Sequence, residues 1–502
     1  VFITRNVLGS LFLGAFAGTL LLAEGNLLAV PLQLVERHLL PNFASSWKSG
    51  AVLFTLLLGG MVHLLERGGI LQAFLQRLLH GQSGRRIEGG AVAFGLVCFF
   101  DGLANSLMVG RIFQPLAGSA GLNRLRLAYI VDTTSAAVAC LAFISTWIAY
   151  QLAMIREGLL LAGREGEADP YSVFFASIPH NYYAWFALLL MVLAIARQWN
   201  IGPMGRLVPR DAPDWTPAAR EGGEAPSAGG LWRAWVPVAS LLLVVFGGIY
   251  LDGTARLGQP AWPLSVQNLA LAFSEANVPA ILIIASTVAS LLAWLFFPGV
   301  SLARGETRES IFLEGLFQLF KPVLILIMAW MLSSTLRDLE AAAYLGELLG
   351  GRIPPALFPL AVFLTAGLVA FTTGTSWGTM GLLMPLAIPL AFGLSPDHPG
   401  TAWALLPMVA GAVFSGAVFG DHCSPISDTT IVSSMACGVD TLDHVRTQLP
   451  YALLAAFGAA LFGFLPAAAL GGSGWWAPAG SAGFLVFLLA AHAFSQRNAG
   501  KS

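Results

Sequence analysis

Apolar runs dominate the chain, and many of them approach the length of a membrane-spanning helix. A helix needs about 20 mostly apolar residues to cross the hydrocarbon core of a bilayer. The runs that predict such helices are 8–28, 49–65, 89–107, 128–155, 181–196, 235–251, 278–297, 311–333, 354–371, 380–392, 401–419, 449–470 and 475–494. Because several are short and some would pair as half-helices around a break, we expect about 11 to 13 helical elements. The pattern predicts an all-α polytopic membrane protein.

Composition supports this interpretation. Of the 502 residues, 56% are hydrophobic and only 11% are charged, whereas an average soluble domain has roughly 25% charged residues. Membrane lipid is therefore the expected partner, and the formal net charge of -1 gives no indication of a nucleic-acid partner. The four cysteines lie in or beside apolar runs without the paired spacing of zinc ligands, so we interpret them as small buried residues. No cleavable signal peptide is visible, and the start at Val1 inside an apolar run suggests that a native N-terminal helix is cut.

Loop charges predict the orientation. The segment 197–233 is the only long linker and carries five arginines, and the tail after 494 holds Arg497 and Lys501. In contrast, 156–180 is rich in acidic residues and 252–277 holds a single arginine. Positively charged loops remain on the cytoplasmic side of a membrane. We therefore expect the linker and the C-terminus to be cytoplasmic and the other two loops to be external.

The two halves of the chain carry matching interruptions. A short amphipathic stretch in each half (69–80 and 339–350) precedes an apolar run that leads into a glycine-containing polar motif, 98–106 and then 372–379. The tripeptide Asp-Thr-Thr follows at 132–134 and again at 428–430. One recurring tripeptide alone would be chance, but interrupted hydrophobic segments at corresponding places point to a transporter site within an inverted-topology repeat.

This pattern predicts two broken helices or re-entrant hairpins. The expected units are a first repeat (1–196), a linker with one connecting span and an external loop (197–277), a second repeat (278–470) and a C-terminal span and tail (471–502).

The most polar stretch, 420–430, directly follows the apolar run 401–419. Polar groups at membrane depth are costly and mark a cavity or an ion path. Pro425 breaks the helix and makes nearby carbonyls available as ligands. We predict that Asp428 binds Na⁺, a hard cation that prefers oxygen ligands, and that it takes up a proton when the cation leaves. The alternative is that Asp428 caps the following helix. The hydroxyls predicted to share this site are those of Ser424, Ser427 and Thr429.

Acidic residues of the first half are further candidates. Asp132, followed by Thr133, is the expected pseudo-symmetric partner of the site, with a helix cap as the alternative. Asp101 is either a second titrating group or a strut hydrogen-bonded to Asn105. Arg111 is either the counter-ion of Asp101 or a loop residue whose charged end reaches for the interface.

Asp421 and His422 form an adjacent pair in the same polar stretch. The pair could relay protons or could hydrogen-bond to each other at a helix end, and we expect a supporting role for both. With Cys423 they make a weak transition-metal motif, because adjacent side chains splay apart and no spaced partner ligands follow.

The motif 372–379 has two interpretations. Its glycines predict an unwound helix whose carbonyls and hydroxyls face a cavity. The residues expected there are Gly374, Thr375, Ser376, Gly378 and Thr379. The segment 374–378 also fits the Gly-x-Ser-x-Gly pattern of hydrolase nucleophiles, with His422 as a conceivable base, but that motif requires a strand–turn–helix context. An intramembrane hydrolase is therefore a remote alternative.

At these residues the chain resembles the NhaC family of Na⁺/H⁺ antiporters. The likeness is carried by 99–115 with 127–147, by 373–389, and by 416–434 with the later Asp443-His444 and Gln448-Leu449-Pro450. The resemblance implies a bacterial inner-membrane antiporter driven by the proton gradient, often dimeric, without a cofactor beyond the transported Na⁺ and H⁺. Members of the family also move organic solutes. Many carry a second acidic residue where Gly102 follows Asp101 here.

The leading hypothesis is exchange of Na⁺ (or Li⁺) for H⁺ by alternating access, with Asp428 as the carboxylate shared by cation and proton. The alternative is Na⁺- or H⁺-coupled transport of an amino acid or carboxylic acid, held at a half-helix N-terminus in 374–379.

Overall fold

The structure is a computed structural model. It describes residues 7–70, 82–99, 101–207, 230–258, 272, 275–298, 302, 305–341, 344, 354–394, 399–470 and 476–499. Most of the predicted amphipathic stretches 69–80 and 339–350 and most of the linker 197–233 lie outside these residues.

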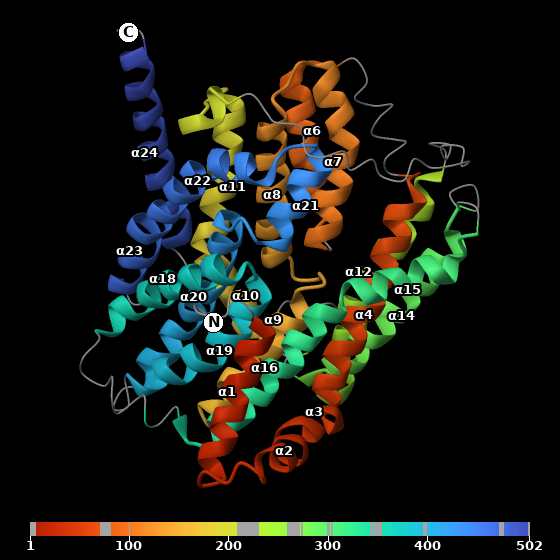
Figure 1. The fold of residues 1–502 in the computed structure, drawn as a ribbon, viewed down its shortest axis with the longest axis vertical. Coiled ribbons are helices and arrows are strands. Elements are labelled where there is room, and N and C mark those ends of the chain that lie inside the picture. The colour runs from red at the N-terminus through yellow and green to blue at the C-terminus, as the bar shows by residue number, and fades with distance from the viewer. Residues whose placement is uncertain are drawn as a thin grey trace.

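Every regular element in the described residues is a helix, which confirms the all-α prediction (Figure 1). Nine helical segments among them are long and apolar enough to cross a membrane. Apart from four helix pairs, the α-helices are α1 (Val7–Leu22), α2 (Val30–Gln33), α3 (Leu40–Ala44), α4 (Ser46–Gly68), α10 (Pro170–Ser177), α11 (Tyr182–Ala196), α12 (Trp232–Arg256), α14 (Val278–Phe296), α15 (Arg308–Gln318), α16 (Phe320–Asp338), α22 (Thr441–Gly458), α23 (Leu465–Ala469) and α24 (Trp476–Ala499), with Leu319 alone between α15 and α16.

The remaining helices form four consecutive pairs with a short interruption between the members. The pairs are α6 (Gly84–Val97) with α7 (Gly102–Ser119), α8 (Arg124–Leu141) with α9 (Ile148–Leu161), α18 (Phe358–Thr373) with α19 (Ser376–Gly393), and α20 (Pro399–Cys423) with α21 (Asp428–Cys437). The interruption between α6 and α7 lies at the motif 98–106, where a broken helix was predicted. The expectation of a continuous run over 128–155 was wrong. Interruptions inside apolar segments are tolerated where the freed backbone groups are buried in protein or line a cavity.

The interruption at Gly374 shows why a helix stops there. Gly374 has φ +65°, a left-handed conformation that ends α18, and a Cβ at this position would lie 2.5 Å from the carbonyl oxygen of Ile426. Only glycine meets both demands without strain. Ile426 itself lies in the interruption between α20 and α21, so the two interruptions of the second half contact each other.

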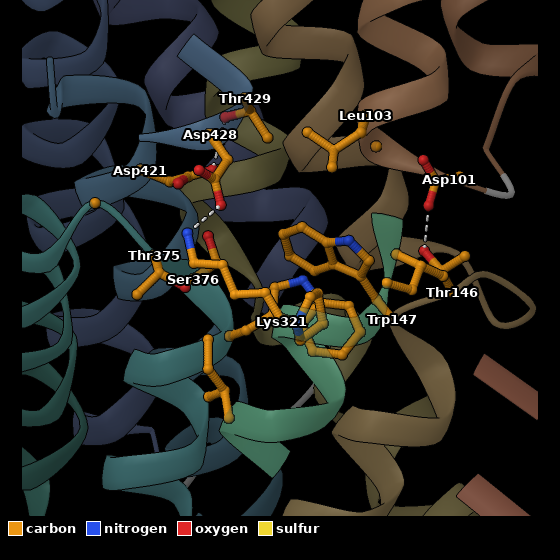
Figure 2. Close-up of a pocket in the computed structure, with 16 residues that line it drawn as sticks. Asp101, Leu103, Thr146, Trp147, Lys321, Thr375, Ser376, Asp421, Asp428 and Thr429 are labelled. Carbon is orange, nitrogen blue, oxygen red and sulfur yellow. Dashed lines mark hydrogen bonds and ion pairs between the residues drawn. The ribbon is translucent and has the colours of Figure 1, made fainter. Parts of the chain in front are cut away.

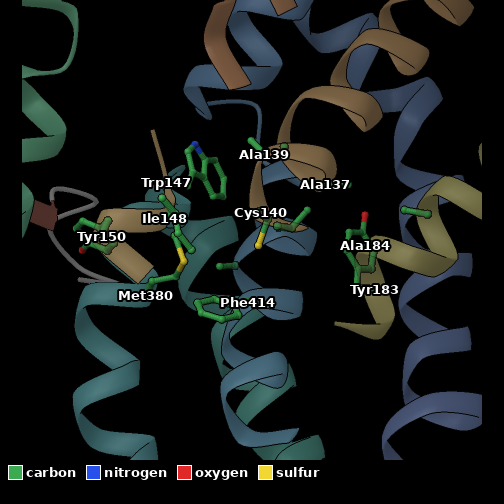
Figure 3. Close-up of a cluster of buried hydrophobic side chains, with 14 of the residues drawn as sticks. Ala137, Ala139, Cys140, Trp147, Ile148, Tyr150, Tyr183, Ala184, Met380 and Phe414 are labelled. Carbon is green, nitrogen blue, oxygen red and sulfur yellow. The ribbon is translucent and has the colours of Figure 1, made fainter. Parts of the chain in front are cut away.

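Helices of the two halves cross over one another around these interruptions. Helix α21 packs against α7, and α19 packs against α9 (Figure 1). The aromatic rings of Trp147 and Tyr150 pack edge-on against Trp377, with centroids 6.1 and 4.6 Å away. Below them Met380 and Phe414 extend the same buried apolar cluster (Figure 3). This cluster fixes the interruptions relative to one another.

The four cysteines, Cys98, Cys140, Cys423 and Cys437, are all buried free thiols, as predicted.

Candidate functional site

A pocket of about 550 Å³, including its open mouth, lies where the four interruptions meet (Figure 2). Its wall also includes the start of α16. The lining residues are Asp101, Gly102, Leu103, Thr146, Trp147, Leu319, Lys321, Pro322, Ile325, Gly374, Thr375, Ser376, Trp377, Asp421, Asp428 and Thr429. This volume includes open solvent at the mouth, and the enclosed part has room for an ion with a few water molecules.

Asp421 is the buried carboxylate on one side of the pocket. It is the third residue from the end of α20, and its side chain receives hydrogen bonds from two hydroxyls, one at the end of the interruption and one in the first turn of α21. Ser427 Oγ donates to Asp421 Oδ1 (2.6 Å), and Thr429 Oγ1 donates to Asp421 Oδ2 (2.8 Å). The two hydroxyl oxygens are 3.1 Å apart. A hydroxyl that donates its proton still has two lone pairs, so these oxygens form a compact set of hard donors for a cation.

Asp428 lies in a different environment from the one predicted. Its side chain is 56% exposed, and Oδ2 is 3.3 Å from Nζ of Lys321, which is 61% exposed. Asp428 was expected at membrane depth, shielded from water, and this expectation was wrong. The reason is that Pro425 and Ser424 turn the chain between α20 and α21, with Ser424 Oγ accepting from the backbone N–H of Ile426 (3.4 Å), so that the first residue of α21 faces the pocket mouth (Figure 2).

Asp101 faces the pocket from the opposite side (Figure 2). It is the N-cap of α7: Oδ1 accepts from the N–H of Ala104 (2.7 Å), and Oδ2 accepts from the hydroxyl of Thr146 (2.7 Å). The backbone N–H of Asn105 donates to the carbonyl of Asp101 (3.0 Å), whereas the Asn105 side-chain amide donates to the carbonyl of Gly95 (2.7 Å) and not to the Asp101 carboxylate.

Arg111 is not the counter-ion of Asp101. Its Nη1 lies 3.3 Å from Oε1 of Glu66 on α4, and Glu66 is not among the residues that line the pocket.

The motif at the start of α19 contributes a cap to the pocket wall. Thr375 is the N-cap and accepts from the N–H of Gly378 (3.3 Å). Ser376 Oγ donates to the carbonyl of Ala417 on α20 (3.2 Å). Thr379 donates to the carbonyl of Thr375 (2.9 Å) and is buried against its own helix, so the prediction that it faces the cavity was wrong. Helices precede and follow this motif, which excludes the strand–turn–helix context of a hydrolase nucleophile.

Asp132 lies behind the pocket and is fully buried. It is in the middle of α8, which excludes the helix-cap alternative, and it is not placed as Asp428 is at the start of α21. Its Oδ2 accepts from Gln448 Nε2 (2.6 Å) and from Thr430 Oγ1 (3.2 Å), and it lies 3.3 Å from Nε2 of His444. The neighbouring Thr133 is likewise buried.

His422 supports this buried network and does not hydrogen-bond Asp421 in the described part of the chain. Its Nδ1 is 3.0 Å from the hydroxyl of Tyr183, and its Nε2 is 3.1 Å from the backbone carbonyl of Asp132. The carbonyl of His422 accepts from Gln448 Nε2 (2.8 Å). The supporting role of His422 stays a prediction.

Four helix N-termini reach the pocket. The helices α7, α9, α19 and α21 all begin with residues of its wall or immediately next to it. A helix N-terminus carries a partial positive charge and unpaired N–H groups. Such ends favour negative charge, and they offer donors to an anionic group of a solute.

The sequence analysis did not identify three residues that contribute to the pocket or to the buried network behind it. Thr146 lies in an interruption that was taken for continuous helix, and Lys321 lies in a run taken for one span. Lys321 is one of just three lysines in the chain, which was an available signal. Gln448 was noted only as part of a family stretch.

Comparison with known proteins places the chain among transporters. Residues 138–465 match the profile of the Na⁺/H⁺ antiporter family. The chain belongs to this family. An uncharacterized protein of Haemophilus influenzae is 30% identical over 458 residues, which cover 89% of this chain and 85% of that protein. The resemblance to NhaC is confirmed at the family level, and the hydrolase alternative is wrong because the family is one of transporters.

Two shorter matches concern named antiporters. The Na⁺/H⁺ antiporter NhaC of Alkalihalophilus pseudofirmus is 35% identical over 151 residues, 28% of this chain and 29% of that protein. The malate-2H⁺/Na⁺-lactate antiporter of Bacillus subtilis is 40% identical over 98 residues, 19% of each protein. The family therefore includes antiporters of inorganic cations and of organic solutes.

A solved structure shows the same fold. The YdaH transporter of Alcanivorax borkumensis superposes with a TM-score of 0.55 over 88% of each chain, at 16% sequence identity.

Proposed function

We propose that this protein exchanges Na⁺ (or Li⁺) for H⁺ across a bacterial inner membrane by alternating access, and that Asp421 is the carboxylate that binds the cation. The observation that carries the proposal is the Asp421 cluster. A buried carboxylate with two hydroxyls within 2.8 Å lies at the wall of a pocket formed by four helix interruptions. Alkali cations are hard and prefer carboxylate, hydroxyl and carbonyl oxygens.

The ligand set follows from the contacts. Asp421 supplies the charge, and Ser427 and Thr429 supply hydroxyl oxygens. Thr375, the N-cap residue of α19, lies in the wall of the same pocket. Asp428 is assigned a different role from the one expected at first. Its ion pair with Lys321 lies at the pocket mouth, where it adjusts the charge that an entering ion meets.

Alternating access requires one group of helices to move relative to another around a fixed site. The interruptions come from both halves of the chain and meet at one pocket, so rocking of the predicted repeats would open the pocket to either side. Proton uptake neutralises the carboxylates when the cation has left, because two carboxylates facing one low-dielectric pocket repel each other.

Coupled transport of an organic carboxylate is the second candidate function. It is favoured by one specific observation, the convergence of four helix N-termini and the ammonium group of Lys321 on the pocket. Both are groups that bind carboxylates. The relative named as a malate/lactate antiporter is consistent with this candidate.

Reconstituted protein distinguishes the two candidates. Proteoliposomes with an imposed pH gradient are mixed with Na⁺ alone, and internal pH is followed with a trapped dye. Cation exchange predicts that Na⁺ dissipates the gradient at once without any organic solute. If the pH responds only after malate, lactate or an amino acid is added, the second candidate is correct. A response to neither Na⁺ nor solutes would refute both.

A further inference from the structure

We propose that Asp132 and His444 form a separate proton-carrying site behind the pocket, so that the transported proton and the transported cation bind to different groups. This inference rests on the proposed exchange function and deepens it. In the simpler scheme a single carboxylate of the pocket would bind the cation and the proton in turn.

The Asp132–His444 pair is the most deeply buried titratable cluster that the pocket does not use. Both side chains have no exposed surface, and Asp132 Oδ2 lies 3.3 Å from His444 Nε2. Buried ionisable residues within the membrane are costly and mark proton or ion paths. An adjacent imidazole and carboxylate can hold one extra proton between them, since either nitrogen or oxygen can carry it.

The side chain of Gln448 holds the Asp132 carboxylate in place. Its Nε2 donates to both Asp132 Oδ2 (2.6 Å) and the carbonyl of His422 (2.8 Å), which fixes the orientation of the amide. Three buried acceptor atoms then have no hydrogen-bonding partner in the described part of the chain: Asp132 Oδ1, His444 Nδ1 and Gln448 Oε1. Buried acceptors without a donor are destabilising, so the cluster is incomplete without an added proton or a water molecule.

A short polar path connects the pair with the cation site. Thr430 Oγ1 lies 3.2 Å from Asp132 Oδ2 and 3.1 Å from the backbone carbonyl of Asp421. The charge on the pair is therefore close to the pocket wall, separated from it by buried protein. A proton that binds the pair removes negative charge near Asp421 and weakens cation binding there. A cation bound at Asp421 stabilises the deprotonated pair in turn. This reciprocal effect couples the two ions without a shared group.

Other titratable groups surround Asp132, and they come from several helices. They are His422, Asp421 and Cys423 of α20, Cys437 of α21, Tyr183 of α11 and His444 of α22. The thiols and the phenol are neutral near pH 7. His422 is held between Tyr183 and the backbone carbonyl of Asp132, and among the described residues its ring nitrogens make no hydrogen bond to a carboxylate. The pair with His444 is the one in which an imidazole contacts the Asp132 carboxylate.

The outer end of α22 provides a connection toward the surface. Asp443 precedes His444 and is buried, and its Oδ1 lies 3.6 Å from Nη1 of Arg446, whose side chain is 61% exposed. Asp443 and Arg446 thus place charged groups in the first turns of α22, next in sequence to the buried pair.

Two assays on the same proteoliposomes test the proposal. The first measures proton flux driven by a Na⁺ gradient. The second measures exchange of radioactive sodium for unlabelled sodium at equal concentrations and equal pH, which needs the cation site but no net proton movement. For Asp132→Asn and His444→Gln we expect proton flux to fall by about 100-fold, the scale on which loss of a positioned proton carrier acts. Tracer exchange should remain close to that of the unaltered protein.

Matched variants define the outcomes. Asp421→Asn should lose both activities. Thr447→Val is the control, because Thr447 is buried on α22 and its hydroxyl donates to carbonyls of its own helix, so both activities should persist. His444→Gln decides the matter if Asp132→Asn does not fold, since glutamine can keep a hydrogen bond to Asp132 but does not titrate.

Loss of both activities in His444→Gln, or retention of both, would overturn the proposal. If the unaltered protein shows neither activity, the exchange function itself fails, which is a different result from either of these.

Discussion

Replacing Asp421 by asparagine removes one charge from the pocket wall and keeps the size of the side chain. The amide oxygen can accept one of the two hydroxyl protons, and the other hydroxyl can rotate to accept from the amide nitrogen. Two charge-assisted hydrogen bonds become neutral ones, which costs about 1–2 kcal/mol of folding free energy. The variant is therefore expected to fold and to remain inserted in the membrane.

The effect on cation binding should be much larger. At about 4 Å and an effective dielectric constant of about 20, two unit charges attract by about 4 kcal/mol. Each 1.4 kcal/mol is a factor of about ten in affinity, so the apparent Na⁺ affinity should fall about 1,000-fold. Asp428→Asn is the matched comparison. Its carboxylate is half exposed and already paired with Lys321, and in water the same attraction is about 1 kcal/mol. We expect that variant to lose less than about tenfold.

The assay is Na⁺-dependent proton flux in proteoliposomes over a wide range of Na⁺ concentrations, with thermal unfolding of each variant as the folding control. The reasoning predicts a large shift of half-maximal Na⁺ for Asp421→Asn and a small one for Asp428→Asn. The reverse order, with both variants folded, would refute the assignment of the cation to the buried carboxylate and would restore the prediction made from the sequence.

Three further predictions follow from single contacts. Asp101→Ala should lower the unfolding temperature, because it removes a helix cap worth about 1 kcal/mol and leaves the buried Thr146 hydroxyl without its acceptor, a cost of about 1–3 kcal/mol. Asp101→Asn should keep most of that stability, and equal unfolding temperatures for the two variants would contradict the capping role. Gly374→Ala should reduce both stability and transport, since left-handed backbone costs about 1–2 kcal/mol and the new Cβ would lie 2.5 Å from the carbonyl of Ile426; unaltered activity would show that this interruption tolerates movement. Lys321→Gln should leave stability nearly unchanged, because an exposed ion pair is worth at most about 1 kcal/mol, and should raise the apparent Na⁺ affinity by removing a positive charge from the pocket mouth; a weaker affinity would assign Lys321 a supporting role in cation binding.

The apolar pattern was sufficient to predict helices, their approximate bounds and the helix break at Gly374. It was not sufficient to predict where hydroxyl-rich runs break. The segment 128–155 has no proline, and its interruption is stabilised by tertiary contacts, such as Thr146 donating to Asp101. A local pattern does not contain such contacts, because the partners are 45 residues apart along the chain.

The candidate site was predicted in its region but not in its central residue. Asp421 and Asp428 lie on either side of one helix interruption, and which of them points inward depends on the direction of the turn at Pro425. The sequence gives the presence of the turn but not that direction. Likewise, Asp132 was singled out, whereas its partners His444 and Gln448 are 312 and 316 residues further along the chain. Their proximity results from the packing of α22 against α8, which only the folded chain brings about.

The matching motifs of the two halves remain a prediction as regards an inverted repeat. The structure shows an interruption near each motif, a third at Pro425, where a helix break was predicted, and a fourth between α8 and α9 that the sequence pattern did not indicate. The two Asp-Thr-Thr tripeptides lie at different places, in the middle of α8 and at the start of α21. Equivalence of the halves should therefore be sought in the order of the interrupted helices rather than in these tripeptides.

The most direct test of the central claim is to titrate purified protein in weakly buffered detergent solution with NaCl and to record bound sodium and released protons together. Saturable Na⁺ binding accompanied by proton release, with both signals lost in Asp421→Asn and retained in Asp428→Asn, is the predicted result. Sodium binding without proton release, or the same two signals from Asp421→Asn, would contradict the claim that this pocket exchanges a cation for protons.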